Sequence, residues 1–233
     1  MSTSNIVAIR EAEVRLSSRT WNFSQDYAVA IDGYWHLRTA QQPSLFNGDI
    51  LLLDDWSLSE GRLLGTCLTT DYKSFLYWRE HDALDRSVTN FFAAAALHSR
   101  EGWLILAQMG TNHSSSGLIF PPCGTLHSED VKDGRVDLDA NILREVEEET
   151  GLALSKTDLK QRFLILDGTQ LAYMRLIELP WSAAEIIRSI ASYLATETEP
   201  EISRIFVVKG REDIIESVMP KFTVAYIEHA FRP

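Results

Sequence analysis

The chain has 233 residues, of which 45% are hydrophobic and 24% charged, which is enough apolar material for one large globular domain or two small ones. Its formal net charge is −11, and its Lys and Arg residues form no cluster of the kind that binds polymeric nucleic acid. Two cysteines are too few for a disulfide framework and no apolar run is long enough to cross a bilayer, so we expect a soluble cytoplasmic protein that does not bind membranes.

The first part of the chain is predicted to form a small α+β unit. Gly33 weakens its first helix by about 1 kcal/mol relative to alanine. Ser59-Glu60-Gly61 is typical of a hairpin turn, and Asp71 is a good N-cap. In chain order, the expected elements are a helix at 24–41, strands at 49–58 and 61–70, and a short helix at 71–80.

A second and larger α+β unit is predicted to begin near the polar stretch at 81–90, which gives domains at 1–85 and 86–233. Apolar, β-branched and aromatic runs predict its strands, and Ser182 is the expected cap of a helix. Its expected elements are strands at 91–99, 102–110 and 118–124, a polar loop at 125–139 leading to a helix that ends before Gly151, strands at 159–168 and 170–179, a helix at 182–196, a strand at 204–210, and a helix or strand at 222–231.

Four glutamates are crowded into residues 145–149, just before Gly151. On a helix, Glu145, Glu148 and Glu149 lie on one face, and Gly151 suits the position that follows the last turn. Repulsion between the glutamates and the negative end of the helix dipole each cost a few tenths to about 1 kcal/mol. Mg²⁺ or Mn²⁺ would offset both costs, since these ions take carboxylate and phosphate oxygens as ligands. The alternative is a solvated acidic helix face.

Residues 144–152, Arg-Glu-Val-Glu-Glu-Glu-Thr-Gly-Leu, resemble the C-terminal half of the Nudix box, R-E-U-x-E-E-x-G-U with U aliphatic. Every specified position of that half matches. Residues 115–124 are similar to the strand that leads into the box, with Pro122-Cys123-Gly124 in place of the usual Pro-Gly-Gly. The resemblance covers roughly residues 88–232 and implies a Nudix-type α/β/α sandwich with a mixed sheet.

The N-terminal half of the box departs from the family pattern. The pattern places a glycine fourteen residues and a glutamate eight residues before the arginine, and here these positions hold Asp130 and Val136. If Gly124 is the box glycine, the loop is six residues longer than usual and the first glutamate is missing. An aspartate within 130–139 is then the candidate for holding the arginine and the helix.

The resemblance implies roles for the residues on and near this helix. Glu145, Glu148 and Glu149 would bind the metal, with a backbone carbonyl near Gly124, and Glu145 would be a third ligand or the base for an attacking water. Arg144 would orient a carboxylate and is expected to point away from the glutamate face. The catalytic candidates are therefore Glu145, Glu148 and Arg144.

Other candidates lie in loops. Glu201 is the preferred further metal ligand among the glutamates of 195–204, and the alternative is that all of these are surface charges. His113 and His127 are candidates for contacting substrate phosphate, or are ordinary loop histidines. Trp35, Trp56, Tyr72, Phe75 and Trp78 would either stack on a base or sugar or belong to the core.

The resemblance implies a divalent-metal-dependent pyrophosphohydrolase that cleaves the diphosphate of a nucleoside diphosphate linked to another moiety. A sugar nucleotide or ADP-ribose is the preferred substrate, because residues 1–85 are similar to the additional N-terminal region of larger family members, where it serves substrate recognition or dimerisation. A homodimer is expected on the same ground. Val136 leaves an alternative open, namely a catalytically silent Nudix fold used for ligand sensing or partner binding.

Overall fold

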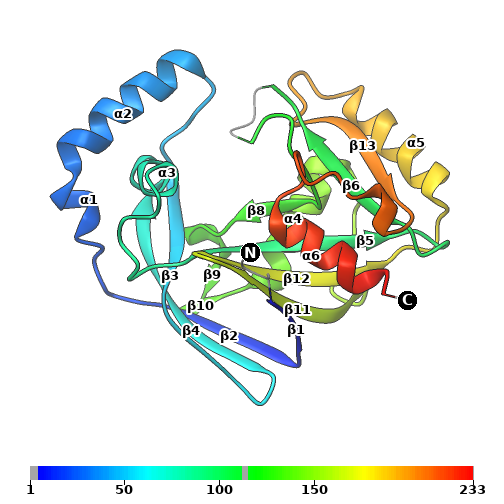
Figure 1. Cartoon of the computed structure of the whole chain (residues 1–233), viewed down its shortest axis with the longest axis horizontal. Helices are drawn as coiled ribbons and strands as arrows, with labels where there is room; N and C mark the ends of the chain where they lie inside the picture. The colour runs from blue at the N-terminus through cyan, green and yellow to red at the C-terminus, as the bar shows by residue number, and fades with distance from the viewer. Residues whose placement is uncertain (1–4, 112–114, 233) are drawn as a thin grey trace. The chain divides into compact units, whose positions relative to one another are not determined.

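The computed structural model describes residues 5–111 and 115–232 (Figure 1). Contacts between residues divide the chain into two compact units. Unit 1 contains residues 1–10, 92–124 and 138–233, and unit 2 contains residues 11–91 and 125–137. This division differs from the single boundary expected near residue 85. The first residues of the chain and the stretch 125–137 pair with strands that are distant in sequence, and such pairings leave little local signal.

Unit 1 is built on one sheet in which some neighbouring strands are far apart in sequence. The strand order is β1-β11-β12-β5-β6-β13, with β7 beside β6 and β8 beside β5. The edge strand β1 is antiparallel to β11, with Val7 opposite Leu164. The expected hairpin at 159–179 is confirmed by the antiparallel pair β11 and β12. The strands are β1 (Asn5–Ile9), β5 (Asn90–His98), β6 (Leu104–Met109), β7 (Ile119–Phe120), β8 (Cys123–Thr125), β11 (Leu159–Asp167), β12 (Gln170–Glu178) and β13 (Ile202–Val208).

Helices cover both faces of this sheet. On β12, Met174 belongs to the apolar cluster that contains Tyr226 of α6 (Lys221–Ala230). The neighbouring Tyr173 and Arg175 contact Asp139 of α4 (Leu138–Thr150) instead. Because successive strand residues point to opposite faces, α4 and α6 lie on opposite sides of the sheet. The layering is therefore helix, sheet, helix, with α5 (Ala183–Leu194) beside β13 and a short 3₁₀ turn, η2, at Arg211–Asp213.

Unit 2 is a second sheet with strand order β3-β4-β2-β10-β9, in which β2 and β4 are parallel. Two expectations are wrong in detail here. The helix at 24–41 is interrupted at Tyr27, and the loop at 125–139 contains a small hairpin that turns at Asp133-Gly134. The elements are β2 (Glu11–Leu16), α1 (Phe23–Asp26), α2 (Ala28–Gln41), β3 (Asp49–Ser59), β4 (Arg62–Asp71), α3 (Tyr72–Glu80), η1 (Ser128–Asp130), β9 (Val131–Lys132) and β10 (Arg135–Val136).

The core of unit 2 is aromatic. Trp21, Phe23, Phe75 and Trp78 pack with aliphatic residues of β3 and β4 in one buried cluster. Phe75 and Trp78 are each only 1% exposed, so these two belong to the core and offer no surface for stacking a ligand. The predicted N-cap of α3 is confirmed, since the Asp71 carboxylate accepts a hydrogen bond from the Ser74 amide at 3.1 Å.

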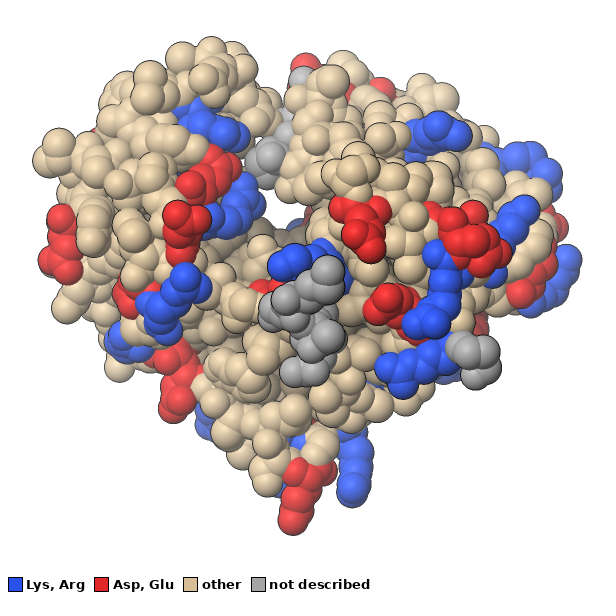
Figure 2. Space-filling model, in the orientation of Figure 1, with Lys and Arg blue, Asp and Glu red and all other residues tan. Residues whose placement is uncertain are grey.

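The α+β fold class expected from the sequence is confirmed by these elements. Within residues 5–111 and 115–232, no helix is long and apolar enough to cross a membrane. On the face shown in Figure 2, Lys and Arg side chains are interspersed with Asp and Glu.

Candidate active site

The glutamates of α4 differ in their exposure. Glu149 is buried, with 6% of its surface exposed, and the Glu145 side chain is 14% exposed. The Glu148 side chain is 59% exposed, and Glu147 is exposed as well. The helix therefore presents Glu145 and Glu149 inward, with Glu148 at the rim and Glu147 in solvent.

The strand β8 supplies the wall against which these glutamates lie. The Ala95 amide of β5 donates to the Pro122 carbonyl at 2.9 Å and so fixes the start of β8. The Cys123 amide donates to the Glu149 carboxylate. A Cβ atom at position 124 would overlap the Glu145 carboxyl group, so only glycine permits this close approach. The structure thus brings Gly124, Glu145 and Glu149 together.

Arg144 lies on the same face as the glutamates. Its guanidinium is 2.8 Å from the Glu145 carboxylate and 2.9 Å from the Glu148 carboxylate. The expectation that this side chain points away from the glutamate face is therefore wrong. A long arginine can fold back along its own helix, where residues one turn apart are neighbours.

Glu149 experiences a strongly negative surrounding. Burial raises the pKa of its carboxyl group well above the usual range, and the charges of Glu145, Glu201 and Glu148 raise it further. Its Oε2 atom is buried without a hydrogen-bond partner. An unmade hydrogen bond of this kind costs about 1–3 kcal/mol, more when the group is charged.

Glu201 is the loop glutamate that the structure brings to α4. It directly precedes β13, and its carbonyl accepts a hydrogen bond of 2.6 Å from the amide of Gly110, the residue that follows β6. Although the residue is exposed, protein atoms crowd its carboxyl group, and this burial together with the Glu148 charge raises its pKa. Glu197 and Glu199 are exposed.

The carboxylates of Glu149 and the neighbouring glutamates suit a hard divalent cation, because they offer oxygen atoms as metal ligands. One of these oxygens, Glu149 Oε2, is buried without a hydrogen-bond partner. In this structure, however, Glu145 and Glu148 both contact Arg144. Accordingly, no group of three or more His, Cys, Asp or Glu side chains in the described part of the chain is arranged to hold a metal ion. Arg144 contacts one oxygen of each carboxylate, so Glu145 and Glu148 could bind a metal through the other oxygen while the guanidinium orients them.

Cys123 lies beside these glutamates but is not a nucleophile. Burial raises the pKa of its thiol well above the usual range, and the charges of Glu149 and Glu145 raise it further. A thiol that stays protonated reacts slowly, since the thiolate is the nucleophile.

The two ends of α4 are fixed by contacts that the sequence did not reveal. At the C-terminal end, the Tyr193 hydroxyl of α5 donates to the Glu148 carbonyl at 2.9 Å, and its ring occupies the space beside Gly151. At the N-terminal end, Asp139 is bonded by Arg175 and Tyr173 of the sheet. These partners are 45 and about 35 residues away in sequence, and no local pattern indicates them.

The structure tests neither of the two candidate histidines as a substrate contact. His113 lies outside the described residues. His127 belongs to unit 2, where its amide donates to the Asp130 carboxylate at 3.0 Å and begins the short helix η1. Substrate contact by either histidine stays a prediction.

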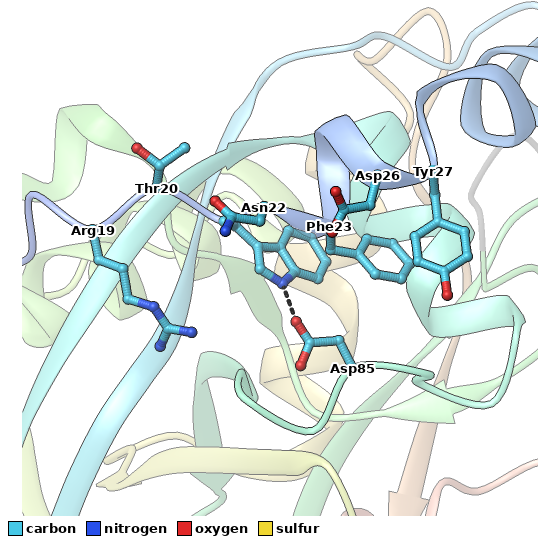
Figure 3. A pocket seen from close by; sticks show the side chains of 8 residues that line it. Arg19, Thr20, Asn22, Phe23, Asp26, Tyr27 and Asp85 are labelled. Atoms are coloured by element: carbon cyan, nitrogen blue, oxygen red, sulfur yellow. Dashed lines mark hydrogen bonds between the residues drawn. The ribbon is translucent and has the colours of Figure 1, made fainter.

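Two cavities lie within unit 2. One, of about 280 Å³, is lined by Arg19, Tyr27 and Asp85 (Figure 3). Trp21 and Phe23 line it as well, and their stacked rings have centroids 4.7 Å apart. The Trp21 indole N–H donates to Asp85 at 2.7 Å, so this donor already has a hydrogen-bond partner within the protein. The other cavity, of about 490 Å³, is lined by Trp56 and polar residues of β2 and β4.

No family model and no curated protein matches this sequence. Solved structures similar to it include a MutT protein from Methanosarcina mazei Go1, at 17% identity over 62% of this chain and 94% of that chain, with a TM-score of 0.42. Another is a bifunctional NMN adenylyltransferase/ADP ribose pyrophosphatase from Francisella tularensis, complexed with AMP and a manganese ion, at 14% identity over 60% of this chain and 40% of that chain, with a TM-score of 0.41.

A third is the NUDIX domain of Shewanella oneidensis NrtR complexed with ADP ribose, at 13% identity over 57% of this chain and 81% of that chain, with a TM-score of 0.35. The chain is thus similar to solved Nudix proteins at low identity. An account of its chemistry has to come from the residues of α4 and their surroundings.

Proposed function

We propose that this chain is a Nudix-type, divalent-metal-dependent pyrophosphohydrolase that cleaves the diphosphate of a nucleoside diphosphate linked to another moiety. One observation carries the proposal: the Glu149 carboxylate is buried with an unbonded oxygen among Glu145, Glu148 and Glu201. This arrangement destabilises the isolated fold, and such local costs are expected where function requires them. A structural acidic face would place these groups in solvent.

In this proposal, Glu149, Glu145 and Glu148 hold the metal, and Glu201 and a carbonyl near Gly124 complete its protein ligands. A divalent ion held by these residues would supply positive charge against the diphosphate oxygens and make an attacking water more acidic. Glu145, positioned between Gly124 and Arg144, accepts the proton of the attacking water. Arg144 keeps that carboxylate oriented. Water adds to one phosphorus, the bridging P–O bond breaks, and the products are a nucleoside monophosphate and a phosphate ester.

The substrate class is the less direct part of the proposal. A sugar nucleotide or ADP-ribose is preferred because unit 2, which includes residues 11–91, adds a second folded body to the chain. Its proposed roles are substrate recognition or dimerisation, and a cytoplasmic homodimer is proposed with it.

A panel of UDP-sugars, ADP-ribose, dinucleoside polyphosphates, NADH and coenzyme A, each with Mg²⁺ or Mn²⁺, tests the reaction. We expect turnover of at least one diphosphate and a higher melting temperature with Mn²⁺, because an ion that binds only the folded state stabilises it. Absence of both turnover and a melting shift contradicts the proposal and favours the silent, ligand-sensing alternative.

A matched set of variants tests the residues. Glu149→Gln is expected to lower kcat by more than about 100-fold, since even residues that only support metal ligands contribute about 10–100-fold. Its melting temperature without metal should be unchanged or higher, because a neutral amide replaces a buried acid whose ionisation the neighbouring glutamates oppose. Glu147→Gln is the control, since that side chain is exposed two residues away on the same helix. Equal activity in both variants contradicts the assigned roles.

A further inference from the structure

The first turn of α4 is attached to the sheet by a network of charged and polar groups that is buried on the side of the sheet, where the Arg175 side chain is 4% exposed, and reaches the surface at Asp139, whose side chain is 21% exposed. Arg175 Nη1 donates to both oxygens of Asp139, at 2.9 and 2.8 Å, and the Tyr173 hydroxyl donates to Asp139 Oδ1 at 2.8 Å. Arg175 is 3% exposed and Tyr173 is 2% exposed. Asp139 is therefore held by two donors that cannot move without disturbing the sheet.

A second arginine supports these donors from the neighbouring strand. Arg162 Nε donates to the Tyr173 hydroxyl at 3.1 Å, and its Nη2 atom is 3.7 Å from Asp139. Its Nη1 atom donates to the carbonyl of Arg10 at 3.2 Å, just beyond β1. Burial and the Asp139 charge raise the pKa of Tyr173 to about 12, so this hydroxyl stays protonated and keeps donating. The network spans β11 and β12 below one end of the helix.

A rigid helix transmits this attachment to the candidate glutamates. Glu145 and Glu149 follow Asp139 by six and ten residues, which is roughly 9 and 15 Å along a helix axis. The opposite end is held by the bond from Tyr193 to the Glu148 carbonyl. Rotation or sliding of α4 would therefore break contacts at both ends.

A buried ion pair is a poor way to gain stability. Because of the desolvation penalty, replacing both partners with apolar residues of similar size is often neutral or stabilising. What such a pair does provide is a unique geometry, since each donor and acceptor has to meet its partner. The ion pair lies at the N-terminal end of α4, so we infer that it serves to position this helix and its glutamates.

We propose that Asp139 and Arg175 are positioning residues, which fix the rotation and depth of α4 so that Glu145 and Glu149 face Gly124. This inference rests on the proposed function. In this role neither residue touches the substrate or the metal. Tyr173 and Arg162 contribute to the same positioning role, because they hold the Asp139 carboxylate in place.

The test compares an apolar replacement of the pair with a matched control. In the Asp139→Leu/Arg175→Met variant we expect a melting temperature within a few degrees of wild type, Mn²⁺ binding weaker by about 10–100-fold in titration calorimetry, and kcat lower by a similar factor. The control is Asp167→Asn/Lys221→Met, which removes an ion pair of 3.7 Å between β11 and α6. It should bind Mn²⁺ like wild type.

A milder variant keeps the test decisive if the double variant does not fold. Tyr173→Phe removes one hydroxyl and should weaken Mn²⁺ binding by about threefold to tenfold. The inference is overturned if Mn²⁺ affinity and kcat are unchanged in every variant that folds. If Glu149→Gln loses Mn²⁺ binding in the same experiments, the proposed function still stands. If wild type itself does not bind Mn²⁺, both proposals are wrong.

Discussion

The α-carbon of Gly124 lies where the Glu145 carboxyl group leaves no room for a side chain. Gly124→Ala would therefore push the carboxyl group away from β8. Because the obstructing group is the flexible end of a glutamate, we expect a stability loss below about 1 kcal/mol. Turnover should fall by about tenfold or more, since small misplacements of catalytic groups cost up to about 100-fold.

The measurements for this residue are kcat/KM and the melting temperature, with Gly33→Ala as the control. Gly33 lies in α2 and has open space around its α-carbon, so alanine there should leave turnover unchanged and add about 0.5–1 kcal/mol of stability. If Gly124→Ala retains wild-type kcat/KM, the approach of Glu145 to β8 has no catalytic meaning.

The site was predictable from sequence only where helix spacing determines it. Residues 145–149 have a periodicity that places three glutamates on one face, and the structure adds which of them are buried. Arg144 was assigned the wrong direction, because its rotamer depends on ion pairs within the fold. Tyr193 and Arg175 gave no signal, since their role depends on the packing of distant elements.

At the scale of elements, the end of α4 and the end of α5 depend on each other. Gly151 has a φ of +69°, and a side chain there would collide with the Tyr193 ring. Gly168, in the β11–β12 turn, has a φ of +60° and open space. Both glycines have a positive φ, but only Gly151 has a side chain packed against its α-carbon. Comparing them therefore separates backbone strain from packing.

Alanine at each of these glycines separates the two effects in urea unfolding. Gly168→Ala should cost about 1–2 kcal/mol, the strain of a left-handed alanine. Gly151→Ala should cost at least about 1 kcal/mol more, because the tyrosine ring has to move and its bond to Glu148 weakens. Equal losses for the two variants mean that Tyr193 does not fix the end of α4.

Elements with local signals were predicted well, and elements with remote partners were missed. The helix α5 has a complete capping box between Ser182 and Glu185, which the sequence shows directly. By contrast, β1 and β2 pair with strands about 150 and 50 residues away, so nothing near them indicates a sheet. The hairpin of β9 and β10 is different, because it is local: its Asp133-Gly134 turn is a hairpin signal that lies within a polar stretch predicted to be a loop.

At the scale of the whole molecule, the stretch between Gly124 and α4 has a structural role. Directly after Gly124 the chain enters unit 2, where β9 and β10 extend the sheet beside β2, and it returns to unit 1 at Leu138. If Gly124 is the box glycine, the six residues beyond the usual box length belong to a stretch that completes the second sheet. The chain passes between the units after residues 10, 91, 124 and 137, so neither unit is a continuous segment.

This threading predicts that residues 86–233 do not fold alone, although they contain the whole Nudix-like segment. The fragment lacks β1, which leaves β11 as an unpaired edge, and its residues 131–136 lose their partner strand β2. We expect aggregation or a broad melting curve in calorimetry, and recovery of a sharp transition when the fragment is coexpressed with residues 1–85. A soluble fragment with a cooperative transition of its own would contradict this prediction. It would show that the loss of the edge strand β1 and of the partner strand β2 has no measurable effect on folding.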